Sequence, residues 1–313
     1  MICRFCEANA DLSEHRLPDA DSGREYFTAK KCAMCETAFL CPLPSSAVLD
    51  SYYNASYYGD KKQKFSGAFE AVIDFFTTRR VKAIISLLSV KNGKIVDIGC
   101  GRGVLLRKFC DFGFECLGFE RDVNFCEEKA NLCIKKGDIK EENLAAESID
   151  VVVLWHVLEH LIEPADCLKE IDRVLSKNGL LIVALPNNMS WQAIIFGSRW
   201  FHLDVPRHTF FFGHHALKKW LEKSHFRAEK ESTFDPIQNV FGFVQSIFNW
   251  VLPGKPNKLY ALMRCQISFL VFLKLMLWSV PVLILLPFAI LESLVSVVFS
   301  SGASSILYLR KIS

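Results

Sequence analysis

The chain has 313 residues, of which 51% are hydrophobic and 23% charged, a composition that excludes an intrinsically disordered protein. The formal net charge of +3 is too small to indicate nucleic-acid binding by itself. The first residues are polar, so no secretory signal peptide is predicted, and we expect the 12 cysteines to stay reduced and to include a metal site.

The chain opens with two cysteine pairs, each with the spacing Cys-x-x-Cys. The four residues are Cys3, Cys6, Cys32 and Cys35. Four thiolates satisfy the tetrahedral coordination of a structural zinc ion. The pattern therefore predicts a zinc-ribbon-like unit over residues 1–45, with Cys41 and His15 as less favoured ligands.

Residues 46–90 are predicted to form a helical linker or lid. Apolar residues recur at steps of three and four between Phe65 and Val90, which indicates a long helix. Four tyrosines precede it: Tyr52, Tyr53, Tyr57 and Tyr58. They either line a substrate pocket or pack the linker, and the charged run Lys61–Lys64 indicates a solvated turn.

A strand, a glycine-rich turn and a helix are predicted between Lys94 and Phe109. The turn has the spacing Asp-x-Gly-x-Gly-x-Gly, whereas a dinucleotide site has Gly-x-Gly-x-x-Gly. The third glycine of a dinucleotide site would fall at Val104. Here the sequence resembles the class I S-adenosylmethionine-dependent methyltransferases, and the alternative is a tight turn without a ligand. The resemblance implies S-adenosylmethionine as cofactor, contacted by Asp97, Gly99, Cys100, Gly101 and Gly103.

Two further acids follow predicted strands. Glu120 ends the strand at residues 115–119, and its two carboxylate oxygens suit the two hydroxyls of a ribose. After a predicted helix at residues 122–132, Asp138 lies in a turn. The resemblance assigns Asp138 to the adenine amine, against the alternative of a simple turn aspartate.

The remaining strands are predicted at residues 150–155, 180–185, 226–230 and 305–309. Strands that alternate with helices indicate a parallel, doubly wound sheet. The predicted fold is therefore α/β, with a Rossmann-like seven-stranded methyltransferase sheet built from residues 91–235 and 303–313.

Histidines are the candidate catalytic residues. The strand at 150–155 ends in His156, where enzymes that methylate base amines carry Asn/Asp-Pro-Pro-Tyr. Histidine suits deprotonation of a hydroxyl or an acidified carbon, and His156 also lies beside the expected cofactor site. Farther on, we predict that Arg207 holds an anionic group and that His208 is a second base. His160 is assigned to helix packing or to a position that supports the site residues, and three others to the surface or to capping: His202, His214 and His215.

The cysteine pairs, Pro42–Ala47 and the tyrosine cluster together resemble the zinc-binding front end of sugar C-methyltransferases. That resemblance implies a substrate site formed between the front end and the cofactor unit, and a sugar, nucleotide-sugar or lipid-linked saccharide as acceptor. An RNA methyltransferase is one alternative, but the ribbon mixes acids with its bases and no nucleic-acid partner is expected. A non-catalytic membrane scaffold is the other, and the intact turn motif opposes it.

An apolar insertion, residues 236–302, separates the last two predicted strands. Between residues 267 and 299 only Lys274 and Glu292 are charged, but Pro281 and Pro287 should interrupt a helix. We therefore predict a helical hairpin that attaches to the cytoplasmic face of a membrane without crossing it. A single span and a buried core or dimer interface are the alternatives. Flanking aromatic and basic residues favour membrane contact: Phe241, Phe243, Phe248, Trp250, Trp278, Lys255, Lys258 and Arg264.

Overall fold

The computed structural model describes residues 2–53, 67–88, 92–123, 131–252, 254–263 and 269–312. Several sequence predictions lie outside these residues: most of the helix at 122–132, Tyr57, Tyr58, the run Lys61–Lys64, and Arg264.

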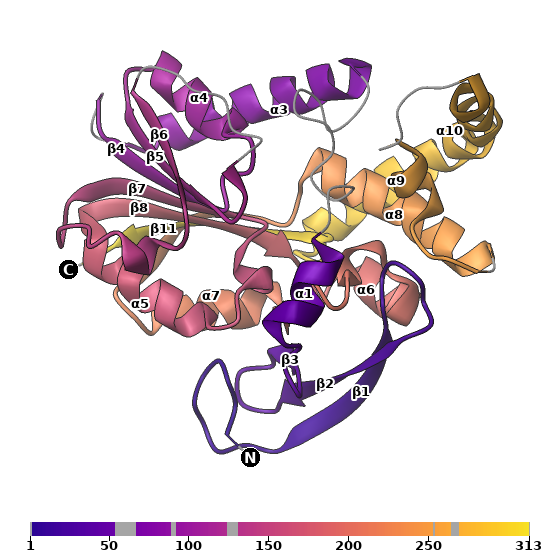
Figure 1. Ribbon diagram of the computed structural model, residues 1–313, viewed down its shortest axis with the longest axis horizontal. Helices are drawn as coiled ribbons and strands as arrows, with labels where there is room; N and C mark the ends of the chain where they lie inside the picture. The colour runs from indigo at the N-terminus through magenta and orange to yellow at the C-terminus, as the bar shows by residue number, and fades with distance from the viewer. Residues whose placement is uncertain are drawn as a thin grey trace.

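A seven-stranded sheet forms the centre of the molecule, with the strand order β10-β11-β8-β7-β4-β5-β6 (Figure 1). The strands β4 to β8 are parallel, and β11 pairs in antiparallel fashion with both β8 and β10. Their bounds are β4 (Lys94–Ile98), β5 (Glu115–Glu120), β6 (Leu132–Lys136), β7 (Ile149–Trp155), β8 (Leu175–Pro186), β10 (Phe226–Ser232) and β11 (Ser304–Lys311). The predicted Rossmann-like methyltransferase fold is confirmed.

Helices cover both faces of this sheet because its central strands are apolar on both sides. Val151 and Val153 of β7 pack with α3 (Gly67–Ile85) and α4 (Val104–Asp111). The alternate residue Val152 faces α5 (Pro164–Val174) and α7 (His214–Glu222) on the opposite side. In Figure 1 these helix pairs lie above and below the sheet.

The amino-terminal segment forms a second sheet of order β1-β2-β3-β9. Its strands are β1 (Leu12–Pro18), β2 (Tyr26–Cys32), β3 (Ala38–Leu40) and β9 (Phe210–Phe211). Because β9 comes from the methyltransferase unit, backbone hydrogen bonds join the two parts. Phe5 strengthens the join, with its ring centroid 5.0 Å from Phe212 and 4.4 Å from Trp220.

Short elements complete the chain around the carboxyl ends of the parallel strands. They are α1 (Ser46–Tyr52), α6 (Trp191–Phe196), and the 3-10 turns η2 (Ile139–Glu141), η3 (Leu158–His160), η4 (Gly197–Arg199) and η5 (Phe201–Leu203).

The insertion between β10 and β11 contains α8 (Pro236–Val251), α9 (Lys258–Met263) and α10 (Phe269–Val298). The predicted hairpin turn is wrong, because α10 runs as one helix through Pro281 and Pro287. A stripe at helical spacing continues through both prolines and packs against α8: Trp278, Val282, Leu285 and Ala289. This packing holds the two halves in one helix despite the hydrogen bonds that the prolines cannot make.

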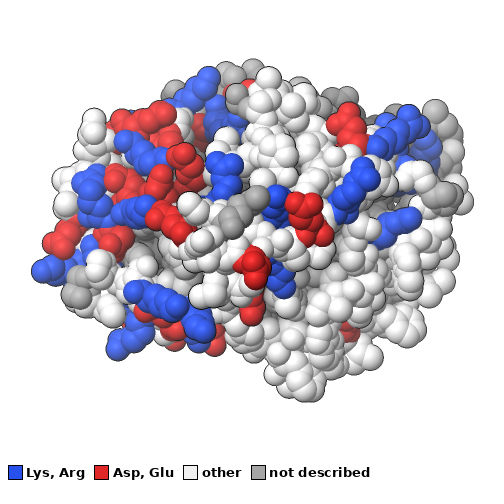
Figure 2. Space-filling view, turned by 90° about the horizontal axis from the view of Figure 1, so that it is seen from below, with Lys and Arg blue, Asp and Glu red and all other residues white. Residues whose placement is uncertain are grey.

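The outer surface of the insertion is apolar. By length and composition, Met276–Val298 could cross a membrane, and only 17% of its most apolar window is buried. Leu277 is 76% exposed. In Figure 2 the lower right of the visible face is almost free of charged side chains, whereas Lys and Arg side chains gather above it, at the upper right. Of the predicted interfacial aromatics, Trp250 is exposed, whereas Phe241, Phe243, Phe248 and Trp278 pack inside the insertion, which corrects that expectation.

Candidate functional site

The four cysteines of the amino-terminal pairs converge on one point. The Sγ atoms of Cys3 and Cys35 are 3.7 Å apart and those of Cys6 and Cys32 are 3.9 Å apart, and all four lie within 4.8 Å of one another. Four sulfurs at about 2.3 Å from a zinc ion stand about 3.8 Å apart. Backbone N–H groups of Phe5 and Met34 donate to Cys3 and Cys32, which helps to orient these sulfurs. The cluster therefore fits the predicted structural zinc ion.

The glycine turn after β4 has a backbone that other residues rarely adopt. Gly99, Gly101 and Gly103 all have positive φ values, of 67°, 54° and 72°. A Cβ on Gly99 would collide with Val157, whereas a Cβ on Gly101 would meet nothing within 4 Å. The turn thus packs on one side and leaves open space on the other, where a ligand can approach the backbone.

The acids predicted to contact the cofactor lie around this turn. Glu120 accepts hydrogen bonds from the backbone N–H of Gly101 and Arg121, both at 2.8 Å. Asp97 is buried, and burial, together with the charge of Glu120, raises its pKa to about 8. Asp138 caps the η2 turn by accepting from the Lys140 N–H at 3.2 Å, which is the turn role that the sequence left as an alternative. Cys100 is half-buried, and its thiol lies against the Cα of Gly118.

His156 connects the glycine turn to a cavity. It follows β7 directly and has a φ of 55°, and the next residue, Val157, packs on Gly99. Its Nδ1 donates to Oε1 of Glu159 at 3.3 Å, while Nε2 is buried without a hydrogen-bond partner among the described residues. Glu159 is only 2% exposed. Burial opposes ionisation of Glu159, but the hydrogen bond from His156 and the nearby His160 and His208 hold its pKa below the usual value. A non-glycine residue with positive φ and an oriented, free imidazole nitrogen is typical of a functional position.

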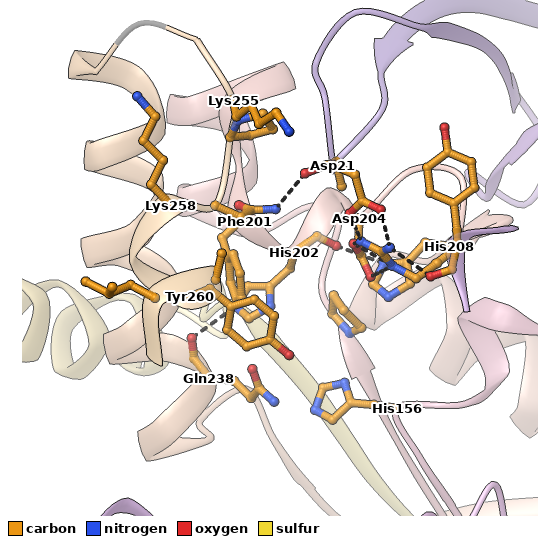
Figure 3. A pocket seen from close by; sticks show the side chains of 18 of the residues that line it. Asp21, His156, Phe201, His202, Asp204, His208, Gln238, Lys255, Lys258 and Tyr260 are labelled. Atoms are coloured by element: carbon orange, nitrogen blue, oxygen red, sulfur yellow. Dashed lines mark hydrogen bonds and ion pairs between the residues drawn. The ribbon is translucent and has the colours of Figure 1, made fainter. Parts of the chain in front are cut away.

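The cavity has a volume of about 720 Å³ and brings together three parts of the chain. Its walls come from the amino-terminal sheet and α1, from the carboxyl ends of β7 and β8, and from the insertion (Figure 3). The described lining residues include Asp21, Tyr52, His156, His160, His202, His208, Gln238 and Tyr260. The two predicted bases, His156 and His208, therefore share one cavity, which the glycine turn does not line.

His208 and its neighbours are held by backbone carbonyls. Burial lowers the pKa of His208 to about 4, and the nearby His160 lowers it further, so His208 is neutral at pH 7. Its Nδ1 donates to the His202 carbonyl at 2.9 Å, and Nδ1 of His160 donates to the Arg207 carbonyl at 3.0 Å. Ligand atoms of Glu159, His160 and His208 lie within 4.8 Å of one another, close enough for these residues also to hold a metal ion.

Arg207 is neutralised by carboxylates of the protein. Its guanidinium donates to Asp204 at 2.5 to 3.1 Å and to Asp21 at 2.9 and 3.1 Å. It also donates to the Tyr52 carbonyl at 3.3 Å. Burial raises the cost of ionising Asp204, but the charge of Arg207 outweighs it and lowers the pKa of that carboxyl. Two carboxylates of the protein, Asp204 and Asp21, therefore already pair with Arg207, and the structure does not support its predicted role as an anion-binding residue.

Two of the histidines assigned to the surface or to capping are buried, and a third histidine, His160, lies beside the site residues. His202, placed at the surface, is 6% exposed and lines the cavity, with Nε2 donating to the Gln238 carbonyl at 3.0 Å. His214, also placed at the surface, is 2% exposed, and its Nδ1 lies 2.8 Å from the Ser305 hydroxyl. His160 lies in the cavity wall, 3.0 Å from the Tyr53 hydroxyl. Partners distant in sequence fix all three positions, so local pattern could not reveal them.

A Rossmann-like sheet, the Asp-x-Gly-x-Gly-x-Gly turn and an acid at the end of β5 define a protein that binds S-adenosylmethionine. The open space at Gly101 and the Glu120 carboxylate beside it fit this cofactor. Residues 72–231, just over half of the chain, match the protein family described as "Methyltransferase domain". The chain belongs to this family and is an S-adenosylmethionine-dependent methyltransferase.

Part of the chain is similar in sequence to curated relatives. A ubiquinone biosynthesis O-methyltransferase of Azorhizobium caulinodans is 25% identical over 55% of this chain and 74% of its own length. The protein of the same name from Pelagibacter ubique is 29% identical over 31% of this chain, and the match spans 44% of that relative. Among solved structures, an S-adenosylmethionine-dependent methyltransferase from Archaeoglobus fulgidus is 19% identical, with a TM-score of 0.48, and the match covers 76% of this chain and 94% of that one.

Proposed function

We propose that the enzyme methylates a hydroxyl group or a carbon of an acceptor bound in the cavity. A sugar, a nucleotide-sugar or a lipid-linked saccharide is the acceptor class. The observation that carries this proposal is the position of His156, which lies between the glycine turn and the cavity and has a buried Nε2 without a hydrogen-bond partner in the described part of the chain.

S-adenosylmethionine, when bound, supplies a methyl group on a positively charged sulfur. The acceptor oxygen or carbon would take this methyl group, and the electrons of the broken sulfur–carbon bond would return to sulfur. Nε2 of His156 takes the proton of the acceptor, and Glu159 stabilises the resulting imidazolium through Nδ1–H. His208, whose pKa is lowered to about 4, is a weak base and serves better as a hydrogen-bond acceptor for the substrate.

The lining of the cavity supports a polar acceptor. Side chains with hydroxyl, amide and imidazole groups line part of its walls, among them Tyr260, Gln238 and Asn257, beside charged and apolar side chains. Its volume is in the range of about 300 to 1,000 Å³ found for small-molecule sites. Such a cavity suits a saccharide-sized head group better than a flat aromatic base.

A paired comparison tests this function. His156→Asn keeps a residue that tolerates positive φ, so the backbone should be preserved. We expect methyl transfer to fall by about 10²- to 10⁴-fold while S-adenosylmethionine binding stays within threefold. Gly101→Asp should abolish cofactor binding. Metabolite extracts of cells that express each variant are searched by mass spectrometry for species heavier by one CH₂ group. If wild type and Gly101→Asp cells have the same species, the proposed function is wrong.

We also infer that the insertion attaches the enzyme to a membrane surface. The exposed residues of α8, of α10 and of the neighbouring α6 are mainly apolar, and they include Trp250, Leu283 and Ile194. Residues near the start of α10, such as Lys274, share a cavity with His156 of the sheet. This arrangement supports a helix that lies beside the enzyme in the interface rather than one that carries its ends to opposite sides.

Vesicle sedimentation tests the attachment. The wild type should sediment with vesicles of phosphatidylcholine and phosphatidylglycerol, and Leu277→Glu combined with Leu283→Glu should lower the bound fraction at least fivefold. Val72→Glu places the same charge on an exposed apolar residue of α3 and should change nothing. Equal binding by all three proteins would contradict the attachment.

A further inference from the structure

The two walls of the cavity differ in charge. Asp21 and Asp204, on one wall, both pair with Arg207, and Glu159 accepts from His156. The opposite wall belongs to the insertion and carries Lys255, Lys258 and Lys274. Figure 3 shows Lys255 and Lys258 across the cavity from Asp204 and His208.

These three lysines, here called the lysine rim, come from three separate segments. Lys255 is in the loop after α8, Lys258 begins α9, and Lys274 is on α10. No carboxylate of the described residues lies within ion-pair distance of Lys255 or Lys274. The cavity lining carries four cationic side chains, Arg207 and the three lysines, against three carboxylates, so the excess positive charge lies at the lysine rim.

The lysine rim adjoins the apolar surface. Lys274 and Trp278 both line the cavity, whereas Met276, Leu277 and Val280 between and beyond them are exposed. A ligand whose charged group lies at the lysines can therefore place a hydrocarbon chain along α10 without leaving the protein surface. A ligand without a hydrocarbon tail would make no contact with the apolar surface of α10.

We propose that the lysine rim binds the phosphate group of an acceptor that carries a hydrocarbon tail. The phosphate lies at Lys255, Lys258 and Lys274, the tail follows α10, and the part to be methylated extends toward His156. Lysine ammonium groups bind phosphate oxygens as point charges without requiring one fixed geometry. The proposal rests on the proposed function and narrows its acceptor class to phosphate-bearing lipids.

Three compounds distinguish binding of the charged phosphate group from binding of the hydrocarbon tail. Calorimetry on the full chain compares dodecyl phosphate below its micelle concentration with dodecyl glucoside, which has the same tail and a neutral head, and with inorganic phosphate. Dodecyl phosphate should bind the wild type at least tenfold more tightly than either of the others. The double variant Lys255→Gln/Lys274→Gln should weaken dodecyl phosphate binding at least fivefold and leave dodecyl glucoside binding unchanged.

Controls make each outcome decisive. Lys219→Gln removes an exposed lysine of α7 outside the cavity and should behave as the wild type. Equal binding of dodecyl phosphate and inorganic phosphate would show a site for soluble phosphates and overturn the lipid assignment. Equal binding of dodecyl glucoside, or an unchanged double variant, would overturn the lysine rim. S-adenosylmethionine binding is measured on the same proteins, so loss of the cofactor in the wild type would count against the proposed function and not against the rim.

Discussion

The glycine turn and the acceptor cavity are built in different ways. The turn is contiguous in sequence, and its shape follows from three glycines with positive φ beside β4. The cavity combines the amino-terminal sheet, the ends of β7 and β8, and the insertion, and Asn257 donates to the Ala20 carbonyl at 3.2 Å where the first and last of these meet. Cofactor binding therefore centres on one motif, whereas the proposed recognition of the acceptor depends on parts that must be held together.

Removal of zinc should have the largest effect on this arrangement. Cys35→Ser breaks the four-sulfur site, and zinc contributes about 10 to 16 kcal/mol to the folding of small zinc units. We expect the β1–β2–β3 sheet to unfold and methyl transfer to stop, while S-adenosylmethionine binding stays within threefold. Metal content by mass spectrometry and titration calorimetry measure the two effects. Cys41→Ser lies outside the four-sulfur group and should keep one zinc ion per chain.

Replacement of Arg207 should have the next largest effect. Arg207→Met leaves Asp204 and Asp21 without their common partner, and loss of one member of a buried ion pair costs about 3 to 5 kcal/mol. Denaturant unfolding should show a decrease of this size. Asp21→Asn removes only the half-exposed partner and should cost about 1 kcal/mol or less. Similar, small losses in both variants would mean that this ion pair does not join the amino-terminal sheet to the rest.

A further prediction concerns the pH dependence of stability and involves the core alone. Burial raises the pKa of Asp97 to about 8, whereas an aspartate in the unfolded chain titrates near about 3.9. The folded state thus keeps a proton that the unfolded state releases, so stability without cofactor should fall as pH rises between about 4 and 8. Melting temperatures of Asp97→Asn should lack this slope, and those of Asp166→Asn, an exposed residue of α5, should keep it. A parallel slope in Asp97→Asn would assign the pH dependence to another group.

Sequence alone sufficed for features that depend on local pattern. Alternation of apolar strands and helices predicted the doubly wound sheet, and the glycine spacing carried the resemblance that implied the cofactor. The predicted hairpin was wrong because it considered only the effect of the prolines and not the apolar stripe that packs α10 against α8. The burial of His202 and the pairing of Arg207 with Asp21 depend on residues 36 and 186 positions away, which no local signal encodes.

The position of β11 inside the sheet means that the sheet can be completed only after the whole chain has been synthesised. β11 lies between β8 and β10, yet it is made after the whole apolar insertion. A ribosome therefore exposes α8 to α10 while the sheet still has a gap and strand β10 has no neighbour, a condition that favours aggregation in water. Early capture of the nascent insertion by a bilayer would protect the unfinished chain, and translation in the presence of vesicles should raise the soluble yield.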